Sequence, residues 1–180
     1  MSLKIKAGSI TNLTDARFFA SYGVDYIGFC FDPLSPNYIS PQQALAIKGW
    51  LHNVKIVAEF ANQDAENIQG MIDFLQPDVI ECKSSEFGFL NFELPGILKC
   101  SFNDLKSISE GNYLFVLIDD YNGEDISTVK HSVMINITEK QNDFLNTNIS
   151  AVQIKGTPES EVGVKNYDEL AELLQQMIER

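Results

Sequence analysis

The sequence has 180 residues, a formal net charge of −12 and 44% hydrophobic residues. A chain of this size can bury one hydrophobic core, so we expect a single domain over residues 1–180. Its 13 Lys and Arg residues are scattered, which argues against nucleic acid as a partner because phosphate neutralisation needs grouped cations. No apolar run approaches the roughly 20 residues of a membrane span, and the first residues contain no apolar signal core. These features predict a cytoplasmic protein that contacts neither nucleic acid nor membrane; they do not predict its oligomeric state.

Short β-rich runs alternate with helical patterns along the whole chain. The predicted strands span 4–8, 26–31, 55–60, 79–82, 97–102, 113–119, 133–137 and 151–155. Helical periodicity spans 13–22, 41–51, 65–75, 85–92, 104–109, 126–130, 139–146 and 168–178. Eight strands with intervening crossovers predict a (β/α)8 TIM barrel. The fold usually needs about 250 residues, so we expect a compact barrel with shortened helices after strands 4 to 6. An open doubly wound sheet is the alternative.

Three cysteines, Cys30, Cys82 and Cys100, lie inside apolar runs without a C-x-x-C spacing. An odd number in this setting favours reduced, packed thiols over disulfides or metal ligands. We therefore predict neither a cofactor nor a metal site.

Polar residues interrupt the predicted strands near their carboxyl ends, although buried parallel strands are usually almost wholly apolar. They are Lys6, Glu59, Glu81, Lys99, Asp119, Asn136, Gln153 and Lys155. One interpretation is a lattice of compensating charges inside the barrel, which we consider for Lys6, Glu59 and Lys99. The other is a binding site at the mouth. Asp119 favours the second, because it ends the most apolar run of the chain at the edge where sites in this fold are built.

Three stretches resemble one enzyme family. The first, 6–16, matches K-I-C-G-I-T-N-x-x-D-A at Lys6, Ile10, Thr11, Asn12, Asp15 and Ala16. The second, 23–41, follows G-A-D-x-x-G-F-x-F-x-P-x-S-x-R-Y-I-S-P, with Asn37 in place of the arginine. The third, 57–63, is similar to V-x-V-F-V-N-x. On these stretches the chain resembles the phosphoribosylanthranilate isomerases of tryptophan biosynthesis, as a shortened and divergent member.

The resemblance implies an Amadori rearrangement, in which an acid opens the ribose ring and a base removes a proton from the neighbouring carbon. Asp119 takes the place of the acid, whereas the cysteine that serves as base is replaced by Gly8. Losing a positioned base costs roughly 10²- to 10⁴-fold in rate. Ser9 and Cys82 are the substitutes that the sequence offers near strand ends. The resemblance implies substrate contacts from Lys6, Ser9, Asn37, Lys99, Thr138, Lys155 and Gly156.

The family's glycine-rich phosphate loops are also altered. Glu124, Asp125 and Glu139 stand in or beside these loops, and they would repel a phosphate that backbone N–H groups would otherwise bind. We therefore expect an isomerase-like protein whose activity is weak or absent, with a small anionic sugar phosphate as the ligand that the resemblance implies. The alternatives are a non-catalytic binding or regulatory barrel and an isomerase for a different sugar-phosphate-like ligand.

Overall fold

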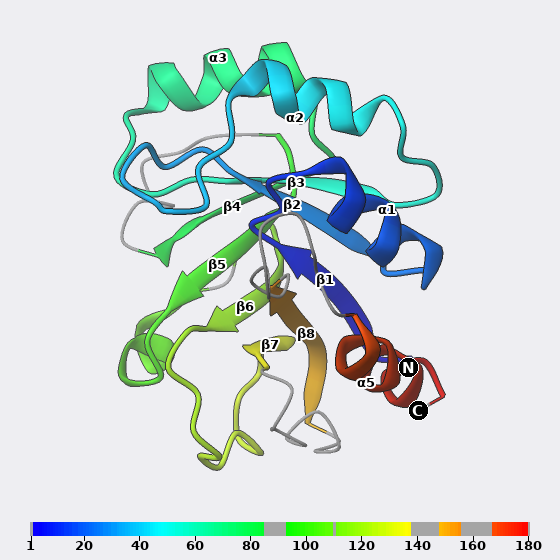
Figure 1. The fold of residues 1–180 in the computed structure, drawn as a ribbon. Coiled ribbons are helices and arrows are strands. Elements are labelled where there is room, and N and C mark those ends of the chain that lie inside the picture. The colour runs from blue at the N-terminus through cyan, green and yellow to red at the C-terminus, as the bar shows by residue number, and fades with distance from the viewer. Residues whose placement is uncertain (1, 85–92, 110, 138–147, 156–166, 180) are drawn as a thin grey trace.

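A computed structural model of the 180-residue chain describes all residues except 1, 85–92, 110, 138–147, 156–166 and 180. Its eight parallel strands pair in sequence order, and β8 pairs with β1, so the sheet closes into a barrel (Figure 1). The predicted (β/α)8 barrel is confirmed, and the open-sheet alternative is wrong. The elements are β1 Lys4–Gly8, α1 Leu13–Ser21, β2 Tyr26–Cys30, α2 Pro41–Lys48, β3 Lys55–Glu59, α3 Ala65–Leu75, β4 Val79–Lys83, β5 Gly96–Cys100, the 3-10 helix η1 Asn103–Ser107, β6 Tyr113–Ile118, β7 Val133–Asn136, β8 Ile149–Lys155 and α5 Asp168–Ile178.

The first two helices begin at side-chain caps. The Asn12 side chain accepts the backbone N–H of Asp15 at the start of α1. Ser40 and Gln43 form a reciprocal capping box at the start of α2, where Pro41 occupies the first turn. These caps satisfy backbone donors that a helix start leaves unpaired. They fix where the chain turns from each strand end into its helix.

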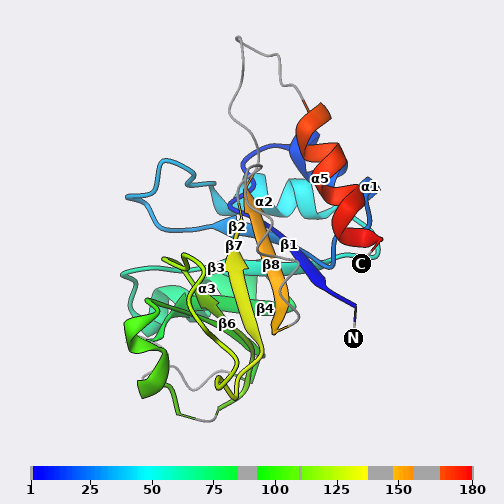
Figure 2. The same ribbon diagram turned by 90° about the horizontal axis from the view of Figure 1, so that it is seen from below.

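The helices cover the barrel unevenly. Figure 1 shows α2 and α3 side by side over the β2–β4 part of the barrel, and Figure 2 shows α5 beside α1 next to β1. After β5 the helix is reduced to η1, and after β6 the described residues 119–132 contain no helix. This is the predicted shortening; the segments 85–92 and 139–146 lie outside the described residues.

The helix predicted over 126–130 is wrong. The segment forms a turn in which the Val129 N–H donates to the Ile126 carbonyl at 3.0 Å. Five residues supply too few backbone hydrogen bonds to offset the cost of starting a helix. Ile126 is instead buried in the core, which fixes the turn.

Two apolar clusters make up the core. One lies between the strands and the helices, and the other consists of Tyr26, Val57, Val79, Ile97, Phe115, Leu117, Met134 and Ala151. The second cluster takes one or two side chains from each of β2–β8, so it fills the inside of the barrel. We call it the barrel floor. Because side chains alternate along a strand, the residue two positions beyond each floor residue also faces the axis.

No helix within the described part of the chain has the length and apolarity needed to cross a membrane.

Candidate functional site at the barrel mouth

The polar residues of the strands lie on the inward rows, just beyond the floor toward the carboxyl ends. Glu59 follows Val57 by two positions, Lys99 follows Ile97, and Asp119 follows Leu117. The same spacing applies to Glu81, Asn136 and Gln153. The inside of the barrel therefore changes from apolar to polar along its axis, and the polar layer forms the mouth.

Lys6 is the centre of a buried ionic cluster. Its side chain is wholly buried, and its Nζ donates to Glu59 Oε1 at 2.7 Å, to Glu81 Oε2 at 2.5 Å and to Gln153 Oε1. All three partners are at most 6% exposed. The three donor protons of an ammonium group are thus all used. For Lys6 and Glu59 the structure fits the interpretation of compensating charges inside the barrel.

Two carboxyls share this single cation, and their environments differ. Burial alone would raise the pKa of Glu59, but the Lys6 ammonium and hydrogen bonds from Ser9 hold that pKa below its ordinary value. For Glu81, burial and the nearby Glu59 charge outweigh the attraction of Lys6 and raise its pKa. Burial opposes the charge on Lys6 as well, but the two carboxylates together raise its pKa. Glu59 is therefore the carboxylate of the cluster, and Glu81 is the carboxyl that takes up a proton first.

A chain of hydrogen bonds connects the cluster to Asp119. Gln153 Nε2 donates to Asn136 Oδ1 at 2.7 Å, and Asn136 Nδ2 donates to Asp119 Oδ1 at 2.8 Å. Asp119 Oδ1 also lies 3.2 Å from Lys99 Nζ, and these two side chains are 46% and 32% exposed. Asp119 thus opens to solvent at one end of a network whose other end is buried.

Two glycines on the inward rows make this network possible. A Cβ on Gly28 would lie 1.9 Å from Glu59 Oε1, so the carboxylate of β3 reaches across β2 only because Gly28 has no side chain. A Cβ on Gly8 would lie 2.8 Å from the amide carbon of Gln153. The space of a side chain at Gly8 is therefore filled by an amide that Lys6 and Asn136 hold in place.

Ser9 joins the network from the end of β1. Its backbone N–H donates to both Glu59 oxygens at 3.1 Å, and its Oγ donates to Oε2 at 2.8 Å. Its φ of +53° lies in the left-handed region, which is uncommon for a residue with a side chain. Since the Ser9 hydroxyl donates to a carboxylate, Ser9 anchors Glu59 in this structure.

The three cysteines face different sides of the sheet. Cys82 and Cys100 belong to the apolar cluster between the strands and the helices, which we call the outer cluster. Cys82 therefore does not face the mouth. Phe29 and Phe31 also belong to the outer cluster, which places Cys30 between them on the inward row at the end of β2. Three strands lie between β2 and β6 in either direction around the barrel, so Cys30 ends the strand opposite the one that leads to Asp119.

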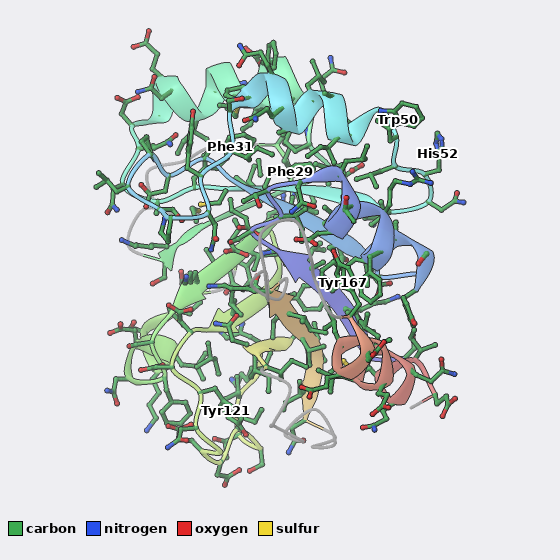
Figure 3. The ribbon with its side chains drawn as sticks, in the orientation of Figure 1. Phe29, Phe31, Trp50, His52, Tyr121 and Tyr167 are labelled. Atoms are coloured by element: carbon green, nitrogen blue, oxygen red, sulfur yellow. The ribbon has the colours of Figure 1, made fainter. Side chains whose placement is uncertain are left out.

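Other residues predicted for the site lie apart from the network. Asn37 is half-buried in the loop before α2, where its backbone N–H donates to Ser35 Oγ at 3.1 Å. Lys155 is exposed at the end of β8. Thr138 and Gly156 lie outside the described residues. Figure 3 shows His52 at the outer edge of the molecule near Trp50. In the chain it precedes the amino end of β3, which is the end away from the mouth.

A cavity of about 770 Å³ opens beside Asp119. Lys83, Ser84, Lys99, Ser101 and Asp119 are among its lining residues. Sequence reasoning did not select Lys83, although its place directly after Cys82 at the end of a predicted strand was a usable signal. The roles of Gly28 and Gln153 carried no such signal, since each depends on a contact between strands that are distant in sequence.

No family model matches the chain. Among curated proteins, it is 44% identical over 73 residues to N-(5'-phosphoribosyl)anthranilate isomerase of Aquifex aeolicus, covering 39% of this chain and 36% of that protein. It is 31% identical over 124 residues to the enzyme of the same name from Marinomonas sp. strain MWYL1, covering 67% and 58%. The matched region thus spans less than two thirds of these relatives.

Solved structures match over nearly the whole chain. The phosphoribosyl anthranilate isomerase of Thermus thermophilus superposes with a TM-score of 0.77 at 18% identity, over 97% of this chain and 98% of that one. A structure of the isomerase bound to reduced 1-(o-carboxyphenylamino)-1-deoxyribulose 5-phosphate gives 0.78 at 21% identity, again over 97% and 98%. At 18% and 21% sequence identity, these matches show a shared fold and do not show a shared activity.

The closed parallel barrel with a polar layer at its carboxyl ends places this protein among the TIM-barrel proteins. Within that class, the chain is similar in sequence to phosphoribosylanthranilate isomerases over part of its length and similar in fold over nearly all of it.

Proposed function

We propose that this protein is a phosphoribosylanthranilate isomerase-like barrel in which the isomerase activity is weak or absent, while the cavity beside Asp119 takes a small ligand. Phosphoribosylanthranilate isomerases act in tryptophan biosynthesis, and Asp119 would be the general acid that this chain retains. In this proposal Lys99 and Ser9 contact the ligand. Lys6 does not contact it and instead holds Glu59 and Gln153 in place. Asn37, Thr138, Lys155 and Gly156 remain proposed ligand contacts.

One observation carries this proposal: the position of the family's base is Gly8, and the Gln153 amide fills the space of its side chain. An amide held by Lys6 and Asn136 cannot accept a proton from carbon at neutral pH. The Glu59 carboxylate nearby already accepts hydrogen bonds from Lys6 and Ser9, which stabilise its charged form and weaken it as a base. Proton abstraction at the end of β1 therefore has no suitable group among these residues.

A second candidate is an isomerase that uses Cys30 as a relocated base. It is favoured by the inward position of Cys30 at the end of the strand opposite β6. A thiol there would stand across the mouth from Asp119, and the two-sided chemistry of the family needs an acid and a base on opposite sides of the substrate.

Complementation of a tryptophan auxotroph that lacks the isomerase tests both candidates. We expect no growth from the wild-type chain at an expression level at which an active family member restores growth, and no turnover of N-(5'-phosphoribosyl)anthranilate by the purified protein. Growth that is lost in Asp119→Ala would overturn the proposal of weak or absent activity. Growth that is also lost in Cys30→Ser, with folding retained, would establish the relocated base.

A further inference from the structure

We propose that Asn122 is a site of spontaneous covalent modification, where ring closure onto the backbone nitrogen of Gly123 converts the asparagine to aspartate and isoaspartate. The site lies in the loop that follows β6, next to the cavity of about 770 Å³ that Asp119 and Asp120 line. The inference goes beyond the proposed function, since it holds whether or not the barrel binds or isomerises anything.

The loop between β6 and β7 holds this pair of residues at an exposed tip. Figure 1 shows the loop projecting from the barrel, and the buried side chains of Tyr121 and Ile126 anchor it on either side of the tip. Asn122 and Gly123 are exposed. The Asn122 backbone N–H donates to Glu124 Oε2 at 2.7 Å, and the Tyr121 hydroxyl donates to the Glu124 carbonyl at 3.2 Å. These bonds close the turn through groups other than the two that would react.

The two reacting groups have no competing partner in the part of the chain that the structure describes. No hydrogen bond there engages the side-chain amide of Asn122 or the backbone N–H of Gly123. An asparagine in a turn typically uses its side chain to bind the backbone two residues on, and the Asn122 amide makes no such bond. The φ of +85° at Gly123 accounts for the glycine. It does not account for the asparagine before it.

The reaction needs only water. The Gly123 nitrogen attacks Cγ of Asn122, the bond from Cγ to Nδ2 breaks, and the proton of the former N–H leaves with the amide nitrogen as ammonia. Water then opens the resulting five-membered imide at one of its two carbonyl carbons. Breaking the new bond to Cγ gives aspartate, and breaking the original peptide bond gives isoaspartate. Glycine favours the attack because it has no side chain to hinder the nitrogen, and ring closure gains from joining both groups in one chain.

Asn53 provides a comparison within the same molecule. Asn122 is the one asparagine of the sequence that is followed by glycine. Asn53 is also exposed and has a φ of +60°, but Val54 follows it. The branched side chain of valine stands beside the nitrogen that would attack. The two sites therefore separate the effect of the glycine from the effect of exposure.

Either product would add a carboxylate to a loop that is already acidic. Asp120, Glu124 and Asp125 belong to it, so the modification makes the surroundings of the cavity more negative and opposes an anionic ligand. Isoaspartate also lengthens the main chain by one carbon between Tyr121 and Glu124, whose hydrogen bond closes the turn. The modification therefore changes both the charge and the shape of the loop beside Asp119.

The test is incubation of the folded full chain at pH 7 and at pH 8. Peptide mass spectrometry locates the change, and labelling by an isoaspartyl methyltransferase identifies isoaspartate. We expect a more acidic form with isoaspartate at position 122 to accumulate, and to accumulate faster at pH 8 because the attacking nitrogen must lose its proton. Asn122→Gln should remove this form, since the longer side chain cannot close a five-membered ring, whereas Asn53→Gln should leave it unchanged. Gly123→Ala should slow its formation.

A synthetic peptide of residues 119–126 sets the time scale, because nothing in it restrains the loop. The comparison of Asn122 with Asn53 is made within the wild-type chain, so it does not depend on the folding of any variant. The proposal is overturned if the folded chain contains no isoaspartate at position 122 once the peptide has reacted, if Asn53 reacts as fast as Asn122, or if a folded Gly123→Ala variant reacts at the wild-type rate.

Discussion

Replacing Lys6 by methionine tests the physical basis of the buried cluster. Lys6 is wholly buried, and among the residues that the structure describes it is the cation that forms ion pairs with Glu59 and Glu81. Methionine keeps an unbranched side chain of similar length and removes the charge. A buried carboxylate without a cation costs far more than protonation does, so in the folded variant both carboxyls should be neutral.

The magnitude follows from the proton that Glu59 must then take up. Keeping a carboxyl protonated costs about 1.36 kcal/mol for each pH unit above its pKa in the unfolded chain. With the ordinary pKa of 4.5, this amounts to about 3.4 kcal/mol at pH 7 and about 0.8 kcal/mol at pH 5. The folded variant binds a proton that the unfolded chain releases, so its free energy of unfolding falls as pH rises from 5 to 7.

Urea unfolding of the wild-type protein and of Lys6→Met at pH 5 and pH 7 measures this difference. We expect the variant to lose about 3 kcal/mol at pH 7 and about 1 kcal/mol at pH 5. Lys4→Met is the control on the same strand: Lys4 pairs with Asp25 at 2.7 Å but is 44% exposed, so its loss should stay below about 1 kcal/mol. Adding Glu59→Gln to Lys6→Met should restore much of the stability at pH 7. A loss that is equal at both pH values would refute the reasoning.

Three further substitutions or measurements probe other contacts. Gly28→Ala should lower the free energy of unfolding in urea by about 1–3 kcal/mol, because the new Cβ would lie 1.9 Å from Glu59 Oε1. In a Glu59→Ala background the same substitution should cost much less. Additive losses in the double variant would contradict the contact. Tyr167→Phe should lower stability by about 1–2 kcal/mol, because the Tyr167 hydroxyl donates to the buried Asp15 carboxylate; an unchanged melting temperature would contradict this. Burial raises the pKa of Cys100 to about 11, so at pH 8 iodoacetamide should modify it roughly 100-fold more slowly than a free cysteine, a rate that peptide mass spectrometry can measure; equal rates would show that the thiol is not shielded.

Much of the fold and the polar layer could be predicted from sequence periodicity. The apolar run 113–118 followed by Asp119 predicted a buried strand with a carboxylate at its end, and the structure has β6 over those residues. The alternation along a strand likewise puts Lys99 beyond an apolar floor residue. Periodicity works here because the inward rows of a barrel repeat every two residues whatever the length of the connecting loops.

The connections within the polar layer could not be predicted in this way. That Glu59 crosses β2 to meet Ser9 depends on how β1, β2 and β3 are staggered around the barrel, and on the missing side chain of Gly28. In the sequence, Gly28 looks like any glycine within a strand. The helix predicted over 126–130 was wrong for a related reason, since the packing of Ile126 outweighed a weak local preference.

The same connections supply a physical reason for the proposal that the barrel fold is kept while the isomerase activity is weak or absent. At the mouth Lys6 donates to Gln153, Gln153 donates to Asn136, and Asn136 donates to Asp119. A substrate that needed any of these groups would first have to break hydrogen bonds inside the protein. A catalytic site gains when its groups are poised for the transition state and otherwise unengaged. Here hydrogen bonding is directed inward and stabilises the barrel.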